Sequence, residues 1–205
     1  MSLFEDQYKT INTISEGTFR DKGSRFIAYS YPFTDENKLK DILNDVKSNH
    51  PKARHHCYAY RLGMDKSVYR INDDNEPAGS AGRPILNTLL SNDLTNIIVV
   101  VVRYFGGTLL GIPGLINAYR AATQESINNA TIVERYQKDV YSIDFDYLQM
   151  NDIMRMIKEQ GIDIQSQSFD NQCKFEIAIR ASLTNRIIAN LSDMPGLRLK
   201  YLKTI

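Results

Sequence analysis

The spacing of hydrophobic residues in the first half of the chain changes repeatedly between strand-like and helical. Residues 24–31 (SRFIAYSY) and 57–62 (CYAYRL) have the composition of strands. Between them, four apolar residues recur at helical spacing, after the capping residue Asp35 and before Pro51. They predict a helix with one buried face: Leu39, Ile42, Leu43 and Val46.

A second group of segments follows, with a strongly polar stretch in its middle. Residues 67–71 predict a strand that forms a hairpin with the preceding one, whereas residues 72–82 (NDDNEPAGSAG) are too polar and too rich in Gly and Pro for regular structure. Residues 84–90 predict a short helix. Residues 96–105 (NIIVVVVRYF) are typical of a strand buried on both faces, and a further helix is expected at 113–129.

The alternation of strands and helices then restarts and runs to the end of the chain. Its order is β-α-β-β-α-β, that of a ferredoxin-like domain. The segments are a strand at 138–147, a helix at 151–160, strands at 162–169 and 173–179 around a turn at 170–172, a helix at 183–191 and a strand at 197–202. The sequence therefore predicts an α+β protein of two domains, residues 1–136 and residues 137–205, divided near the polar stretch 133–137.

Composition narrows the class of protein. Hydrophobic residues make up 42% and charged residues 24% of the 205 residues, which is ordinary for a globular chain. The longest apolar run, residues 97–102, is far shorter than the about 20 residues that a membrane helix needs. Acids near the N-terminus are unlike a signal peptide. We therefore expect a soluble, cytoplasmic protein with no membrane partner, in which Cys57 and Cys173 are buried thiols.

The densest group of polar residues is the loop 73–82, for which two interpretations fit. The carboxylates of Asp73, Asp74 and Glu76 could hold Mg²⁺ while the free loop amides meet a phosphate. Alternatively, the acids bind local amides and glycines such as Gly79 permit positive φ, which gives a well-capped structural loop.

The turn after the long apolar strand is the second candidate. Arg103 lies near the strand's end, and Gly106 and Gly107 follow, where a ligand can approach the backbone closely. The next helix N-terminus would favour an anion, although neither a Walker A loop nor a dinucleotide fingerprint is present. A tight turn with core aromatics is the other interpretation. We expect this turn and the loop 73–82 to face one cleft, with Arg103 either binding a ligand or pairing with a loop acid.

The adjacent residues His56 and Cys57 suggest metal or nucleophile chemistry, but the pattern supports neither. Neighbours on a strand point to opposite faces, no second Cys lies close in sequence, and nothing indicates a lowered thiol pKa. We therefore expect no metal and no cofactor. His56 is kept as a candidate polar contact, and no catalytic constellation is established.

Net charge is only +1, so a nucleic-acid surface would have to be local. Arg61 and Arg70 are expected near each other across the hairpin, with Tyr58, Tyr60 and Tyr69 between them, an arrangement suited to single-stranded nucleic acid. The same tyrosines also suit a core. The basic residues that gather in the first domain are Lys52, Arg54, Arg61, Arg70, Arg83, Arg103 and Arg120.

Taken in order, these segments resemble the IMPACT family and, more closely, its bacterial YigZ branch. The second domain is similar to the C-terminal domain of elongation factor G. The resemblance rests on Gly23-Ser24-Arg25-Phe26, on residues 56–60, on residues 73–82, and on Arg103-Tyr104-Phe105-Gly106-Gly107 with Leu110-Gly111 and Gly114-Leu115.

The resemblance implies a first domain that is an α/β sandwich, similar to the second domain of a ribosomal small-subunit protein, and a link to translation. Eukaryotic IMPACT proteins restrain activation of the kinase that phosphorylates initiation factor 2. They use an additional N-terminal domain with no counterpart in this sequence, so we do not expect that mechanism here. Where the family usually has Lys, Gly and a base, this chain has Leu109, Pro113 and Asn117, which weakens a phosphate site in that loop; Asn75 replaces a usual Gly.

The sequence thus favours a non-enzymatic protein that associates with RNA or the ribosome and regulates translation. One alternative is an enzyme acting with Mg²⁺ on a phosphorylated or nucleotide-like small molecule, with Asp74 and Glu76 as ligands or acid/base groups. Another is a protein-interaction module. The candidate ligand-binding residues are His56, Asp73, Asp74, Glu76, Gly79, Ser80, Arg83, Arg103, Gly106 and Gly107.

Overall fold

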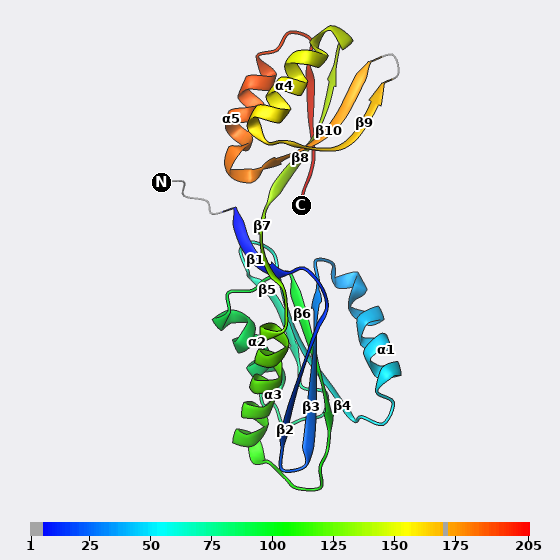
Figure 1. Cartoon of the computed structure of the whole chain (residues 1–205), viewed down its shortest axis with the longest axis vertical. Helices are drawn as coiled ribbons and strands as arrows, with labels where there is room; N and C mark the ends of the chain where they lie inside the picture. The colour runs from blue at the N-terminus through cyan, green and yellow to red at the C-terminus, as the bar shows by residue number, and fades with distance from the viewer. Residues whose placement is uncertain (1–5, 170–171) are drawn as a thin grey trace. The chain divides into compact units, whose positions relative to one another are not determined.

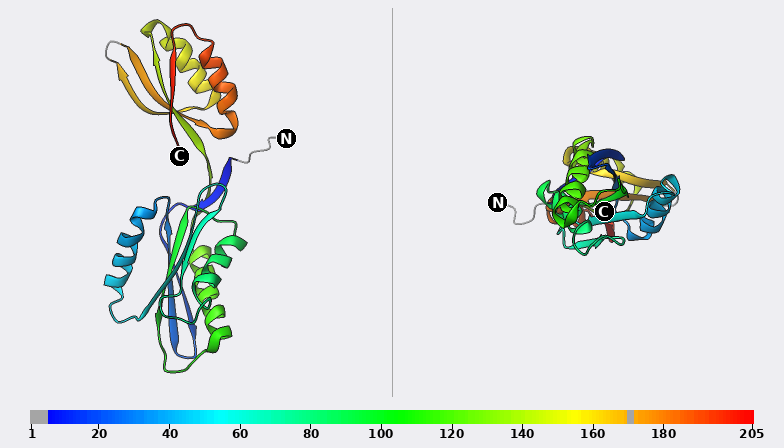
Figure 2. Two further views of the ribbon diagram at one scale, coloured as in Figure 1. Left: turned by 180° about the vertical axis from the view of Figure 1, so that it is seen from behind. Right: turned by 90° about the horizontal axis from the view of Figure 1, so that it is seen from below.

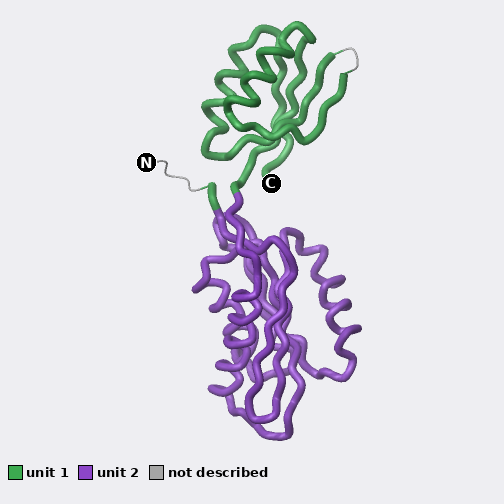
Figure 3. Tube along the Cα trace, viewed as in Figure 1, with its two compact units in different colours: residues 1–7, 136–205 green, residues 8–135 purple. Residues whose placement is uncertain are grey.

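The computed structural model describes residues 6–169 and 172–205 (Figure 1). The N-terminal residues 1–5, and residues 170–171 of the turn expected at 170–172, lie outside this description. The described chain divides into two compact units (Figure 3). We call residues 8–135 the first unit; they are purple and keyed as unit 2 in Figure 3. We call residues 6–7 together with residues 136–205 the second unit; they are green and keyed as unit 1.

The first unit is built on a five-stranded sheet in which every neighbouring pair is antiparallel. The long apolar strand lies at its centre, as its composition predicts. The order across the sheet is β2 (Ser15–Asp21), β3 (Ser24–Pro32), β6 (Ile97–Tyr104), β4 (His55–Leu62) and β5 (Val68–Asn72).

Helices cover both faces of this sheet (Figures 1 and 2). On one face lies α1 (Leu39–Asn49), preceded by the 3-10 turn η1 (Glu36–Lys38); on the other lie α2 (Gly82–Ser91) and α3 (Gly111–Asn128). A hydrophobic core lies on each face of the sheet, and β6 contributes to both. Val99 and Val101 pack with α2 and α3, while Val100 and Val102 pack on the α1 side. The expected burial of this strand on both faces is confirmed.

The sequence pattern predicts neither strand β2 nor two further short strands that lie outside the five-stranded sheet. These two are β1 (Gln7–Ile11) and β7 (Ile132–Tyr136), which pair as a separate two-stranded sheet. The stretch 133–137, expected as a polar boundary, is therefore mostly strand. The chain passes between the two units twice, once within β1 and once within β7.

The second unit has the predicted β-α-β-β-α-β order, and its sheet order β11-β8-β10-β9 is that of the ferredoxin-like fold. The α+β class and the two-part architecture are confirmed. Both helices pack on one face of the antiparallel sheet (Figure 2). The elements are β8 (Lys138–Phe145), the 3-10 turn η2 (Tyr147–Gln149), α4 (Met150–Gln160), β9 (Asp163–Phe169), β10 (Cys173–Arg180), α5 (Ala181–Ser192) and β11 (Arg198–Thr204).

Asp6, at the beginning of the described chain, is held within the second unit by an ion pair in which only the carboxylate is buried. The Asp6 carboxylate is 5% exposed and accepts hydrogen bonds from Arg180 Nη2 at 2.8 Å, from Arg180 Nε at 3.2 Å and from the Ser182 amide at 3.1 Å. The Arg180 guanidinium also lies 3.7 Å from the ring centroid of Tyr136. Hydrogen bonding from Arg180 lowers the pKa of Asp6 well below its ordinary value.

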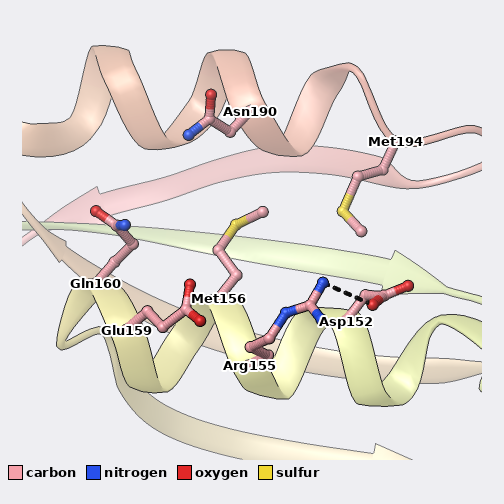
Figure 4. Close-up of a pocket in the computed structure, with 7 residues that line it drawn as sticks. All are labelled: Asp152, Arg155, Met156, Glu159, Gln160, Asn190 and Met194. Atoms are coloured by element: carbon pink, nitrogen blue, oxygen red, sulfur yellow. Dashed lines mark hydrogen bonds and ion pairs between the residues drawn. The ribbon is translucent and has the colours of Figure 1, made fainter.

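A shallow pocket of about 400 Å³ lies between α4 and α5 of the second unit (Figure 4). Asp152 and Arg155 on its rim pair with each other at 3.0 Å. The pocket contains none of the predicted site residues. Across the described residues, no helix is both long and apolar enough to span a membrane.

Candidate functional site

The loop 73–82 is folded around one carboxylate. Asp73 Oδ1 accepts hydrogen bonds from the amides of Ala81 at 3.0 Å and Gly82 at 2.8 Å, and Oδ2 accepts one from the Gly79 amide at 2.9 Å. The buried Ser80 hydroxyl donates to the carbonyl of Pro77 at 2.6 Å. Of the two interpretations of this loop, the one with free amides that meet a phosphate is wrong, because Asp73 already accepts from the amides of Gly79, Ala81 and Gly82. The other, a well-capped structural loop, is the arrangement observed.

The second acid of the loop ties it to the neighbouring strand β4. Asp74 Oδ2 accepts a hydrogen bond from the His56 amide at 2.6 Å, and the Asp74 carbonyl contacts His55 Nδ1 at 2.9 Å. Asp74 and Asn75 both have positive φ, 37° and 67°. Asn tolerates that conformation better than other non-glycine residues, which explains how Asn75 replaces a glycine here.

Glu76 and Arg103 form a buried ion pair that joins this loop to the end of β6. Arg103 Nη1 donates to Glu76 Oε1 at 2.7 Å and to Oε2 at 2.9 Å, and the two side chains are 7% and 3% exposed. The Tyr119 hydroxyl of α3 donates to the same Glu76 Oε1 at 2.8 Å. The two candidate segments thus meet, and Arg103 takes the structural role of pairing with a loop acid. It is not part of an exposed binding surface.

The thiol beside this pair is buried and hydrogen-bonded. Cys57 is fully buried, with Sγ 3.0 Å from the Asp73 carbonyl oxygen and 3.3 Å from the Tyr119 hydroxyl. Burial raises the pKa of Cys57 far above that of an ordinary thiol, so its nucleophilic thiolate is not populated at neutral pH.

His56 does not present its side chain to solvent as a candidate contact should. It is 7% exposed, and within the described structure its Nε2 is buried without a hydrogen-bond partner. Its Nδ1 lies 3.8 Å from Asp74 Oδ2. Burial lowers the pKa of His56, so the imidazole is neutral at physiological pH.

The carboxylates of the loop form hydrogen bonds and ion pairs with other residues of the chain. Glu76 is held by Arg103 and Tyr119, and Asp73 by three amides, so a cation would have to displace these partners. Among the residues that the structure describes, no group of three or more His, Cys, Asp or Glu side chains is arranged to hold a metal ion.

The expected patch of arginine and tyrosine on the β4–β5 hairpin is not formed. Arg61 lies opposite Tyr69, and Arg70 lies opposite Tyr60, so the two arginines point to opposite faces of the sheet. Arg61 is buried and donates from Nη1 to the Leu94 carbonyl at 3.2 Å. The prediction therefore fails because the register places one arginine inside the fold.

Cations do gather at the end of the sheet where β6 finishes. Ser24 Oγ accepts a hydrogen bond from the Gly106 amide at 3.1 Å, which places the β2–β3 turn beside the turn after β6. His55 lies opposite Arg103 in the same sheet, so the loop before β4 reaches this end too. The exposed cations here form what we call the basic end: Lys22, Arg25, Lys52, Arg54 and Arg83.

None of the basic-end side chains forms an ion pair with another described residue. Among the predicted site residues, Arg83 belongs to this surface, and Gly79, Gly106 and Gly107 are exposed. A Cβ on Gly106 would lie 1.9 Å from the carbonyl carbon of Gly23, so only glycine allows the two turns to approach this closely.

Sequence reasoning missed the contributions of Tyr119, Lys22 and Arg25. Tyr119 shows only a helical spacing that marks it for burial, and nothing local indicates that its hydroxyl reaches a carboxylate from another loop. Lys22 and Arg25 lie in or beside a recognised motif, but their proximity to the end of β6 depends on the pairing of β3 with β6.

Comparison with known proteins agrees with this fold. Residues 22–127 match the family described as the Impact N-terminal domain. IMPACT family member YvyE of Bacillus subtilis is 31% identical over 178 residues, which covers 87% of this chain and 82% of that protein. IMPACT family member YigZ of Escherichia coli is 31% identical over 174 residues, covering 84% of this chain and 85% of that protein. A crystal structure of a hypothetical protein aligns with a TM-score of 0.72 at 27% identity, over 98% of this chain and 99% of that one.

Proposed function

Because the chain belongs to the IMPACT family, we propose that it takes part in regulating translation by binding RNA, either free or within the ribosome. The family resemblance supports the link to translation. The single observation that carries RNA as the ligand is the basic end of the first unit, where five exposed cations lie in or beside the loops at one end of the sheet, without described ion-pair partners.

The chemistry of this surface suits a phosphodiester backbone. Lys and Arg side chains that neutralise phosphates release condensed counterions, and that release drives binding without regard to base sequence. Gly79 and Gly107 are exposed and have open space where a Cβ would lie, so a phosphate can approach the backbone there. The buried Arg103–Glu76 pair supports the surface from beneath by holding the loop that precedes Arg83.

The experiment is a salt titration of binding to labelled single-stranded RNA. The slope of log affinity against log salt should be negative for the wild-type chain. It should become shallower by roughly one for each phosphate-contacting cation removed, as in Arg54→Ala and Arg83→Ala. Arg70→Ala is the matched control, since Arg70 is exposed but lies on the β5 edge strand.

A second arm separates free from ribosomal RNA. Co-sedimentation with ribosomes at low salt, compared with binding to the same ribosomal RNA after protein removal, shows whether the ribosome is required. The proposal is wrong if the wild-type chain shows no salt-dependent binding to either target. It is also wrong if Arg70→Ala lowers the slope as much as Arg54→Ala does.

A further inference from the structure

The outward face of α3 carries exposed aliphatic side chains. Leu109, just before the helix, is 82% exposed; Ile112 is 52% exposed and Ile116 is 37% exposed. Ile112 and Ile116 lie one turn apart, and Arg120 follows one turn later on the same face. The opposite face of the helix buries residues such as Leu115 and Tyr119 against the sheet. We call Leu109, Ile112 and Ile116 the α3 stripe.

The charged groups around the stripe are positive. The sequence contains no Asp or Glu between Arg103 and Glu125. The helix has no acidic residue in its first turn and no side-chain cap, so its N-terminal amides keep their partial positive charge. Arg120 lies exposed beyond the other end of the stripe, and its described contact is with the neutral Asn117 at 2.9 Å.

We propose that the α3 stripe binds an amphipathic helix of a partner protein, with acidic residues on both sides of its apolar face. The aliphatic residues of the partner would cover Leu109, Ile112 and Ile116. Its carboxylates would meet the uncapped N-terminus of α3 at one end and Arg120 at the other. This interaction does not depend on RNA binding, because it uses none of the basic-end residues.

Other occupants fit this surface less well. Single-stranded nucleic acid is held by aromatic stacking together with several cations, whereas the stripe is aliphatic. A second copy packed antiparallel on the same face would place the N-terminus of its α3 against Arg120 of the first, which brings two positive groups together. An amphipathic helix with acidic flanks can cover the apolar stripe and also place carboxylates at the N-terminus of α3 and at Arg120.

The test uses the full chain and a fluorescein-labelled synthetic peptide of roughly 16 residues, about 24 Å as a helix. The peptide has Leu at helical spacing and Glu elsewhere. A peptide of the same composition, shuffled to remove the apolar face, is its control. We expect saturable binding by fluorescence anisotropy, at least about tenfold tighter for the patterned peptide.

The variants locate the contact. Leu109→Ser with Ile112→Ser should weaken peptide binding at least about tenfold, and Arg120→Glu should weaken it independently. Val68→Ser, an equally apolar exposed position on β5, should leave it unchanged. Arg54→Ala should also leave it unchanged, so failure of this proposal and failure of RNA binding remain distinguishable.

Several results would overturn the proposal. Equal binding of patterned and shuffled peptides, or unchanged binding by the double Ser variant, excludes the stripe as the docking surface. A wild-type dimer in sedimentation that the double Ser variant dissociates would assign the face to a second copy. Binding to vesicles with anionic lipid that is lost in the same variant, without peptide binding, would assign it to a membrane. If the double variant is unfolded by circular dichroism, Arg120→Glu alone decides.

Discussion

Replacing Arg103 with Met should destabilise the first unit strongly while leaving the salt dependence of RNA binding unchanged. The guanidinium is the cationic partner of Glu76, and both side chains are buried. After the substitution, the Glu76 carboxylate would keep only the Tyr119 hydroxyl at 2.8 Å. A buried charge without its partner loses the attraction that offset its desolvation, so the folded state loses free energy relative to the unfolded chain.

The expected magnitude follows from that loss. Removing one partner of a buried ion pair costs about 3–5 kcal/mol. For a unit of this length that corresponds to a fall in melting temperature of about 10–20 °C. Replacing both Glu76 and Arg103 with Met removes both charges and should cost less than either single change, because neither charge is then left unpaired.

Urea unfolding followed by circular dichroism, on the wild type, both single variants and the double variant, gives the coupling energy directly. Arg54→Ala is the matched control: it should leave the midpoint unchanged and reduce the salt slope of RNA binding. The reasoning fails if Arg103→Met costs less than about 1 kcal/mol, or if the two single changes add without coupling. It also fails if Arg103→Met reduces the salt slope while the fold stays intact.

Three further outcomes are expected. The fragment 137–205 should unfold cooperatively when expressed alone, as followed by far-ultraviolet circular dichroism; a gradual, non-cooperative melt would contradict a separate domain. Arg180 lowers the pKa of Asp6 in the folded state below its ordinary 3.8. The ionised Asp6 therefore stabilises the folded second unit fully above pH 3.8, and this stabilisation is lost as pH falls through the folded-state pKa of Asp6. Asp6→Asn should therefore destabilise the second unit at pH 7 but much less near pH 2, as measured by urea midpoints. Gly106→Ala should lower the melting temperature, since its Cβ would collide with Gly23; an unchanged melt would show that the turns can separate without cost.

The parts of the fold that the sequence predicts are those with a strong local signal. Strand β6 is recognisable because consecutive β-branched residues suit a strand with two buried faces. Strands β1 and β7 carry no such signal: each has five residues, most of them exposed or half-buried, and the two pair across more than half of the chain. Short strands of this kind are stabilised by a distant partner, which a sequence window does not contain.

In the candidate site, too, the sequence predicts the parts that have a local signal and misses those that depend on strand pairing. The loop 73–82 and the turn after β6 are conspicuous in sequence, and their meeting through Arg103 and Glu76 follows from two elements that flank one sheet. Which arginine is buried and which is exposed depends on strand register. Nothing in the local sequence distinguishes Arg61 from Arg83, yet the Arg61 side chain is buried and the Arg83 side chain is exposed.

The pairing of Asp6 with Arg180 has a consequence for synthesis and proteolysis. The two residues are separated by 174 positions, so Asp6 leaves the ribosome long before its partner is made. The second unit can therefore reach its final form only after the first has had time to fold, because the first unit lies, in sequence, as an insertion within the second. A single protease cut in the strand that connects them at 132–136 would leave Asp6 still bound to Arg180. The contacts that then join the two fragments are this ion pair and the remaining pairing of β1 with β7.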